Sequence, residues 1–353
     1  MKRGAIIGLG SIGQYHLKAA QDLVEIVAVC DADSRKLTDL GSYARYQDCD
    51  ELLAKERLDF IDICLPHAYH LPVIEKALER GLDVLCEKPL VSCEDELASL
   101  ERSAKGAPGK LVVNYSYSYS PQFQKLKEVI DSGAFGAPRY VQLRVDLRHT
   151  FWDAPWRSQR TLSGGGVFLD DGIHLCYLAR MLAGADPVSV HANIRTVTFE
   201  REHVDDYGHA LFEFANGCVA EACCTAFQDN RKSFSSRRVE CEKAALILPY
   251  YSLSPRIEVY GRDGTVQDIP IVNPPITGTD RFHSEFVTSF RELLRDYCAG
   301  TFRNPAVLFP ECIKDHRMVF AAYKSAAEQG RKHYFSHIGA TVSSSPSQTS
   351  SPR

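Results

Sequence analysis

Lys88 stands where a lysine side chain could take part in chemistry. The run "LDVLCEKP" has the apolar pattern of a strand that ends in Glu87 and Lys88, and Pro89 follows directly. An ammonium group at the end of such a strand can hydrogen-bond a substrate hydroxyl and stabilise the negative charge that develops on its oxygen. A solvated strand end uses the same residue types, so the spacing alone favours neither interpretation.

A second candidate lies in the run "SGGGVFLDDGIHLCYL". Asp170 and His174 are four residues apart, so a helix would present both side chains on one face. A carboxylate beside an imidazole fixes the ring's tautomer and stabilises its protonated form, which suits a general base near neutral pH. The flanking apolar residues predict a mostly buried helix and favour a functional pair over an exposed one. The triple glycine, residues 164–166, would let the backbone pass close to a ligand or to another element.

The glycines of "GLGSIG" have the spacing of a dinucleotide-binding motif. Gly8, Gly10 and Gly13 follow a predicted strand and open a predicted helix, and a second strand ends in Asp31, 18 residues past Gly13. Such glycines let the backbone approach a pyrophosphate, and the helix N-terminus supplies unpaired N–H groups. The sequence therefore predicts a dinucleotide cofactor.

Asp31 indicates which dinucleotide it is. Its carboxylate can accept hydrogen bonds from both hydroxyls of the adenosine ribose, and it would repel a 2′-phosphate. NAD is therefore favoured over NADP. Arg35 and Lys36 remain able to receive a 2′-phosphate if their loop folds back.

The first 120 residues must position these groups. Strand-like and helix-like segments alternate there, which is typical of a parallel sheet covered by helices. Strands are expected at residues 4–10, 25–31, 59–66, 82–89 and 110–117, and helices at residues 12–22, 71–81 and 93–104.

The pattern changes after about Pro121. One helix is followed by long strand-like runs, and the pairs Asn216-Gly217 and Asp263-Gly264 indicate hairpins between antiparallel strands. Such a sheet usually buries one face against helices. Those covering helices are expected at residues 165–183, 280–298 and 310–328.

These patterns predict an α/β protein with two domains and a tail. Residues 1–120 would form a Rossmann NAD(P)-binding domain, and residues 121–338 a C-terminal α/β domain with a large, mainly antiparallel open sheet. Residues 339–353 are rich in Ser and Pro and carry little to bury, so they are predicted to be disordered.

Composition excludes several classes of partner. The net charge of −4 gives no basic footprint for nucleic acid or an anionic membrane. No apolar run reaches the ~20 residues that span a bilayer. The twelve cysteines are scattered and lack zinc-finger spacing, so free thiols in a reducing, cytoplasmic compartment are expected and no metal is.

Together these motifs resemble the Gfo/Idh/MocA family of oxidoreductases. The ordered set is the glycine motif with Asp31, then "EKP" at residues 87–89, then GGG–x3–D–x–G–x–H at residues 164–174, and the resemblance runs from residue 3 to about residue 335. Members of that family mostly oxidise a secondary alcohol of a sugar or cyclitol, or reduce the matching ketone. Their open C-terminal sheet commonly forms oligomer contacts, which implies a homodimer or homotetramer here.

The resemblance also implies roles for single residues. Lys88 would bind the reacting oxygen, Asp170 would help to place the substrate, and His174 would be the catalytic acid/base. Glu87 and His70 would line the nicotinamide side. The lysine–proline bond is often cis in the family, which would aim the Lys88 ammonium at the nicotinamide and make Lys88 a cofactor contact as well. Further cofactor contacts are expected at Ser11, Ile12, Leu65 and Pro66, and further substrate contacts at His149, Trp156, Arg157 and Tyr177.

Some positions depart from the family pattern. The last strand of the first domain often carries Asn and Arg where this chain has Ser116 and Ser118, an Asn is common where it has His67, and the acid three residues after the histidine is here Tyr177. With few basic residues in the expected cleft, a neutral sugar or cyclitol is favoured, with aminocyclitols and ketone reduction left open.

Two other functions remain. One is an NAD-dependent enzyme that cleaves a glycoside through transient oxidation. The other is a non-catalytic dinucleotide-binding regulator, which has no need of Lys88, Asp170 and His174 together.

Overall fold

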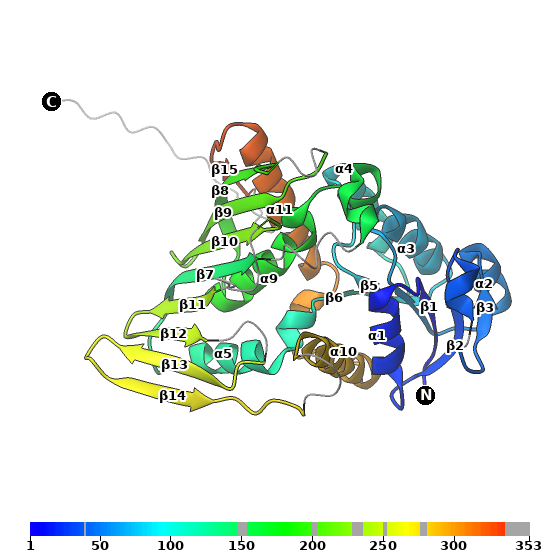
Figure 1. The fold of residues 1–353 in the computed structure, drawn as a ribbon, viewed down its shortest axis with the longest axis horizontal. Helices are drawn as coiled ribbons and strands as arrows, with labels where there is room; N and C mark the ends of the chain where they lie inside the picture. Colours follow the sequence, from blue (N-terminus) through cyan, green and yellow to red (C-terminus); the bar gives the residue numbers. More distant parts are fainter. Residues whose placement is uncertain are drawn as a thin grey trace.

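Two β-sheets stand beside each other in the computed structural model (Figure 1). The structure describes residues 1–38, 40–146, 154–198, 203–227, 236–249, 253–275 and 281–335. The predicted site residue His149 and the predicted disordered tail, residues 339–353, lie outside these residues. The twelve cysteines are all described and all free, as expected. Each described helix is too short or too polar to cross a membrane.

The first sheet has six strands, and every neighbouring pair is parallel. Its order is β3-β2-β1-β4-β5-β6. The strands are β1 (Arg3–Ile7), β2 (Glu25–Cys30), β3 (Ala44–Tyr46), β4 (Phe60–Ile63), β5 (Asp83–Glu87) and β6 (Leu111–Asn114), and the helices between them are α1 (Ser11–Ala20), α2 (Cys49–Lys55), α3 (His70–Glu79) and α4 (Glu94–Ala104). The chain reverses its strand order between β1 and β4, the place where ligands bind in sheets of this kind.

The second sheet has nine strands in the order β14-β13-β12-β11-β7-β10-β9-β8-β15. The strands are β7 (Pro138–Asp146), β8 (Pro187–Arg195), β9 (Tyr207–Phe214), β10 (Val219–Thr225), β11 (Ser236–Cys241), β12 (Ala244–Leu248), β13 (Arg256–Gly261), β14 (Val266–Pro270) and β15 (His333–Tyr334). All described pairs are antiparallel except β7 with β10. The hairpins predicted at Asn216-Gly217 and Asp263-Gly264 connect β9 to β10 and β13 to β14.

Three helical segments cover one face of the large sheet. They are α8 (Val167–Asp170), α9 (Gly172–Ala183) and α11 (Glu311–Ala327). One of the three predicted covering helices, at residues 280–298, does not cover this sheet. It is α10 (Arg281–Ala299), which packs against α1 and the turn at residues 116–119, on the side of the six-stranded sheet (Figure 1). Its apolar stripe predicts burial but cannot say against which element.

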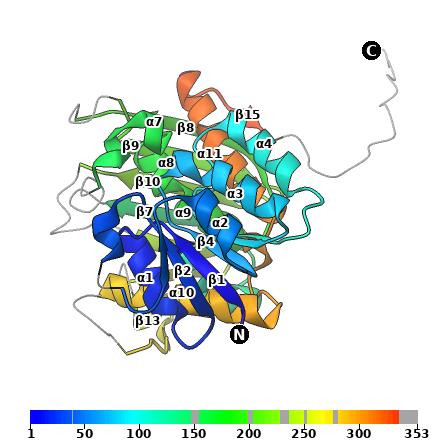
Figure 2. The same cartoon turned by 90° about the vertical axis from the view of Figure 1, so that its right-hand side faces the viewer.

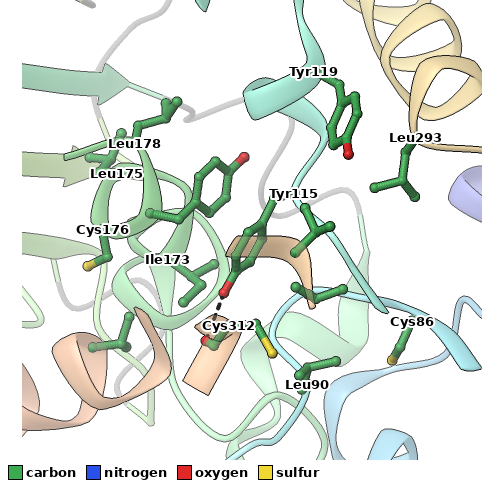
Figure 3. Close-up of a cluster of buried hydrophobic side chains, with 14 of the residues drawn as sticks. Cys86, Leu90, Tyr115, Tyr119, Ile173, Leu175, Cys176, Leu178, Leu293 and Cys312 are labelled. Carbon is green, nitrogen blue, oxygen red and sulfur yellow. Dashed lines mark hydrogen bonds between the residues drawn. The ribbon is translucent and has the colours of Figure 1, made fainter. Parts of the chain in front are cut away.

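One continuous buried cluster joins the two sheets. Figure 3 shows part of it, where Tyr115, just after β6, lies against Ile173 of α9, and its hydroxyl donates to the carbonyl of Cys312, 3.1 Å away. Leu90, two residues after Lys88, belongs to the same cluster. Seen from the six-stranded sheet, its strands and α1 lie in front of α9 (Figure 2). A domain boundary near residue 120 stays a prediction, since α10 returns to the first half.

Candidate active site

The glycine motif forms a turn that only small residues permit. A side chain on Gly13 would place its Cβ 1.9 Å from the Gly8 carbonyl oxygen, and Gly8 itself has φ of +96°. A Cβ on Gly10 would meet nothing within 4 Å, so this glycine faces open space. No side chain caps the N-terminus of α1 at Gly10. The residues present therefore fit an incoming pyrophosphate.

The other predicted cofactor residues lie around this turn. Ser11 is exposed on the first turn of α1, and Ile12 is half-buried behind it. Leu65 and Pro66 follow β4 at the carboxyl edge of the sheet. Their positions suit the predicted contacts, which stay predictions.

Asp31 is held toward the glycine turn. Its carboxylate accepts the N–H groups of Leu9 (2.8 Å) and Asp33 (2.9 Å). The Lys36 ammonium lies 3.1 and 3.3 Å from its two oxygens. Arg35 bonds Asp33 instead, through two contacts of 2.8 Å. A ribose diol must therefore compete with the Lys36 ammonium for the Asp31 carboxylate.

Lys88 and Asp170 meet across the two halves of the chain. The Lys88 Nζ atom donates to Asp170 Oδ1 at 2.6 Å and to the Asp170 carbonyl oxygen at 2.7 Å. Both side chains are almost fully buried. The Lys88–Pro89 bond is cis, as expected. The contact joins a lysine of the first half of the chain to an aspartate of the second half. The predicted meeting of the Lys88 ammonium with the His174 imidazole stays a prediction.

Asp170 is an anchor for positive charge. The Arg157 Nε contacts its Oδ2, and the His67 Nε2 lies 3.6 Å from its Oδ1. Burial alone would raise the pKa of Asp170, but the Arg157 and Lys88 charges hold it well below its usual range. The carboxylate is therefore ionised and serves to hold its neighbours.

The triple glycine brings Asp170 to this position. A Cβ on Gly164 would lie 2.1 Å from the carbonyl oxygen of Ser92, in the loop after Lys88, and one on Gly166 would lie 1.8 Å from the Asp205 carbonyl oxygen. The Asp205 carboxylate then accepts the N–H groups of Gly166 and Phe168, each at 2.8 Å, at the start of α8. Of the two predicted roles for these glycines, close approach to another element is the one observed.

His174 has a different partner from the predicted one. The helix is interrupted at Asp171, between α8 and α9, so Asp170 and His174 do not share a continuous helix. The His174 Nδ1 instead lies 2.7 Å from the Tyr177 hydroxyl, one turn further along α9. Burial and the Lys88 ammonium lower the pKa of His174 well below its usual value. The imidazole is therefore neutral at physiological pH.

Asp171 adds a second carboxyl group beside Asp170. Burial and the Asp170 carboxylate raise the pKa of Asp171 to about 7. Sequence reasoning missed it because only the spacing of Asp170 to the histidine marks a pattern.

Trp156 and Arg157 lie on a short turn, η4 (Pro155–Ser158). The Trp156 ring is edge-on to the His67 ring, with centroids 4.8 Å apart, and the Arg157 guanidinium lies 5.1 Å from the Trp156 ring. The His67 Nδ1 donates to the Ser163 carbonyl oxygen at 2.8 Å. His67 thus belongs to the site, although the sequence marked it only as a departure.

His70 connects two loops at the carboxyl edge of the first sheet. It has no exposed surface, and its two ring nitrogens each lie 2.7 Å from a carbonyl oxygen, that of Pro89 and that of Leu65. The ring therefore ties the loop after β4 to the loop that carries Lys88. Its expected place on the nicotinamide side stays a prediction.

A buried ionic network lies inside the same edge of the sheet, and sequence reasoning missed it. The His16 Nδ1 is 2.8 Å from Asp62 Oδ2, and its Nε2 is 3.1 Å from Glu87 Oε1. Asn114 also donates to Glu87, at 2.5 Å. Burial lowers the pKa of His16, but Asp62 and Cys64 together outweigh this, and the pKa is raised well above the usual value. Glu87 therefore faces a buried imidazolium, one residue before Lys88.

Both halves of the chain match known protein families. Residues 2–115 match the family described as "Oxidoreductase family, NAD-binding Rossmann fold", and residues 123–267 match the "GFO/IDH/MocA C-terminal domain". Among curated proteins, a D-apiose dehydrogenase of Paraburkholderia graminis is 28% identical over 92% of this chain and 88% of its own. An inositol 2-dehydrogenase of Rhizobium meliloti is 30% identical over 54% of this chain and 57% of its own.

Solved structures share the fold. Levoglucosan dehydrogenase in complex with NADH superposes with a TM-score of 0.84 at 18% identity, over 96% of this chain and 100% of that one. An oxidoreductase from Agrobacterium radiobacter in complex with NAD+, L-tartaric acid and magnesium has a TM-score of 0.82 at 22% identity, over 94% of this chain and 98% of that one. At these identities the likeness establishes the fold alone.

Proposed function

The chain belongs to the Gfo/Idh/MocA family of oxidoreductases, and from this membership we propose that it is an NAD-dependent dehydrogenase of a sugar, cyclitol or aminocyclitol. It would oxidise a secondary hydroxyl or reduce the matching ketone. The observation that carries the proposal is the 2.6 Å contact between the Lys88 ammonium and the Asp170 carboxylate. Asp170 precedes His174 by four residues, and the lowered pKa of His174 leaves its imidazole neutral. The similarity to sugar and inositol dehydrogenases supports the substrate class.

The chain's own residues would divide the work on the reacting hydroxyl. Bound NAD supplies the nicotinamide carbon that accepts a hydride. The Lys88 ammonium binds the hydroxyl oxygen and stabilises its alkoxide character. His174 accepts the hydroxyl proton at Nε2, since Nδ1 is engaged by Tyr177. Asp170 orients Lys88, and Trp156 with Arg157 would hold the polyol ring.

One assay separates this proposal from its two competitors. Purified protein is incubated with NAD or NADP and a panel of sugars, inositols, aminocyclitols and their ketones, while cofactor absorbance is followed. Net reduction of NAD by a polyol supports a dehydrogenase. Release of a leaving group without net NADH supports a glycoside-cleaving enzyme, and stoichiometric cofactor binding without turnover supports a regulator.

Cofactor preference is expected to depend on Asp31. Its replacement by Ser removes the charge that repels a 2′-phosphate and releases the Lys36 ammonium to bind it. The ratio of the Kd for NADP to that for NAD should fall at least about tenfold, as expected for about 1.4 kcal/mol. Fluorescence titration with both cofactors measures it. Glu25→Ser, at the other end of β2, serves as the control, and an unchanged ratio in Asp31→Ser would refute the assignment.

The remaining proposals concern assembly and location. The face of the nine-stranded sheet opposite α9 and α11 would join two copies into a homodimer, or four into a homotetramer. Light scattering of the purified protein measures this, and a monomer at micromolar concentration would contradict it. We also propose that the two domains divide near residue 120 and that the protein works in a reducing, cytoplasmic compartment.

A further inference from the structure

Tyr177 is the hydrogen-bonding partner of the His174 Nδ1 atom. Its hydroxyl lies 2.7 Å from His174 Nδ1 and accepts the backbone N–H of Tyr117 at 3.2 Å. Its ring stacks on that of Tyr115, with centroids 4.1 Å apart. Tyr177 is only 2% exposed. The phenol is therefore fixed in place from two sides and cannot swing away from the imidazole.

Aromatic side chains enclose the imidazole from both sides. The Tyr117 ring centroid lies 4.7 Å from that of His174 and the Tyr177 ring centroid 5.5 Å from it. Burial acts most strongly on the pKa of the ring, and among the described residues the charges of Lys88, Asp170 and Arg237 act on it next. Two of these three are cations, so the surroundings disfavour an imidazolium.

We propose that Tyr177 is a positioning residue: its hydroxyl orients His174 as a proton acceptor without bringing the negative charge that would stabilise a protonated ring. The proposal rests on the function given above and deepens it. A phenol hydrogen-bonds the ring as a carboxylate would, but it brings no negative charge to stabilise the protonated form. Burial raises the pKa of the Tyr177 hydroxyl well above its usual value, so it stays protonated at every accessible pH.

This arrangement has a definite consequence for pH dependence. Oxidation of an alcohol needs the neutral imidazole, so its rate should hold to lower pH than the ~6.5 of a free imidazole allows. Reduction of a ketone needs the protonated ring, so its rate should fall as pH rises from acidic values. The protein is thus built to oxidise under conditions where a histidine paired with a carboxylate would already be protonated.

The test is a site-specific NMR titration of His174 in the protein without cofactor. The ring signal is assigned by its loss in His174→Asn. In the wild type it should titrate below the ~6.5 of a free imidazole. In Tyr177→Asp a carboxylate replaces the phenol, and the midpoint should rise by about 1–3 pH units. Asp171, which titrates near the same range, does not confuse this readout because the signal belongs to one ring.

Tyr177→Phe tests the orienting role without introducing charge. It keeps the stack on Tyr115 and removes only the hydroxyl, so the His174 midpoint should stay low while kcat falls and the KM for NAD is unchanged. A wild-type midpoint at or above the free value, or an unmoved midpoint in a folded Tyr177→Asp, would overturn the proposal. The His174 midpoints of the wild type and of Tyr177→Asp are both measured without turnover, so they test the proposal even if no polyol is oxidised.

Discussion

Replacement of Lys88 by Met is expected to lower kcat/KM for the polyol by about 100- to 1,000-fold, the usual cost of losing one donor to a developing oxyanion. Methionine keeps the length of the side chain but removes the charge that binds the hydroxyl oxygen. Asp170 keeps its contact with Arg157, so the rest of the site stays in place. Steady-state kinetics over a range of polyol concentrations measures the effect, with circular dichroism to confirm folding.

A matched lysine shows that the effect is local. Lys55→Met removes an exposed ammonium on α2 that lies 2.5 Å from the Glu51 carboxylate. Lys55 does not belong to the candidate site. Its kinetics should equal those of the wild type, and both variants should keep the wild-type Kd for NAD. A Lys88→Met protein that turns over normally would remove the basis for the proposed chemistry.

Replacement of His16 by Leu is expected to lower the free energy of unfolding by about 3–5 kcal/mol. His16 is fully buried between Asp62 and Glu87, and its ring stacks on Phe290 with centroids 3.7 Å apart. A leucine fills much of the same space but leaves two buried carboxylates without their cation. Urea unfolding at neutral pH, followed by circular dichroism, measures the loss. His209→Leu is the control: it removes a half-exposed histidine that lies 3.0 Å from Glu221, and should cost less than about 1 kcal/mol.

The same network predicts how stability changes with pH. The pKa of His16 is raised in the folded protein, so its contribution is complete below the unfolded value of about 6.5 and is lost as pH rises through the folded value. The wild type should therefore lose stability on the alkaline side, and His16→Leu should not show this loss. Equal pH profiles for the two proteins would contradict a charged His16.

Local sequence patterns predicted most of the helices and strands, but they could not predict which distant elements pack against each other. The alternation of apolar strands and helices predicted every strand of the first sheet except β3, which has three residues and too little pattern to read. The strands β11 and β12 were not predicted. In β11 a charged residue, Arg237, occupies one of the buried positions, so the sequence lacks the apolar alternation of a strand with one buried face. The helix α10 was predicted, but not its packing against α1.

The site shows the same division. The family resemblance placed Lys88 and Asp170 in one site, and the structure brings them into contact. Spacing predicted a pair of Asp170 with His174, yet the helix breaks at Asp171 and Tyr177 takes the place of the carboxylate. His16 and Asp62 lie 46 residues apart, so only the fold shows that they meet. Nothing in the local sequence around His16 indicates that its imidazole is charged and lies between two carboxylates.

The most direct measurement is a single-turnover experiment with protein in excess over NAD and a polyol deuterated at the reacting carbon. The near-ultraviolet absorbance of NADH should appear, the deuterium should move to the cofactor, and it should slow the step. Lys88→Met should bind NAD equally well but give no absorbance change on this timescale. Stoichiometric NAD binding by the wild type, with no NADH from any polyol and no NADH consumed by any matching ketone, would contradict the proposed hydride transfer.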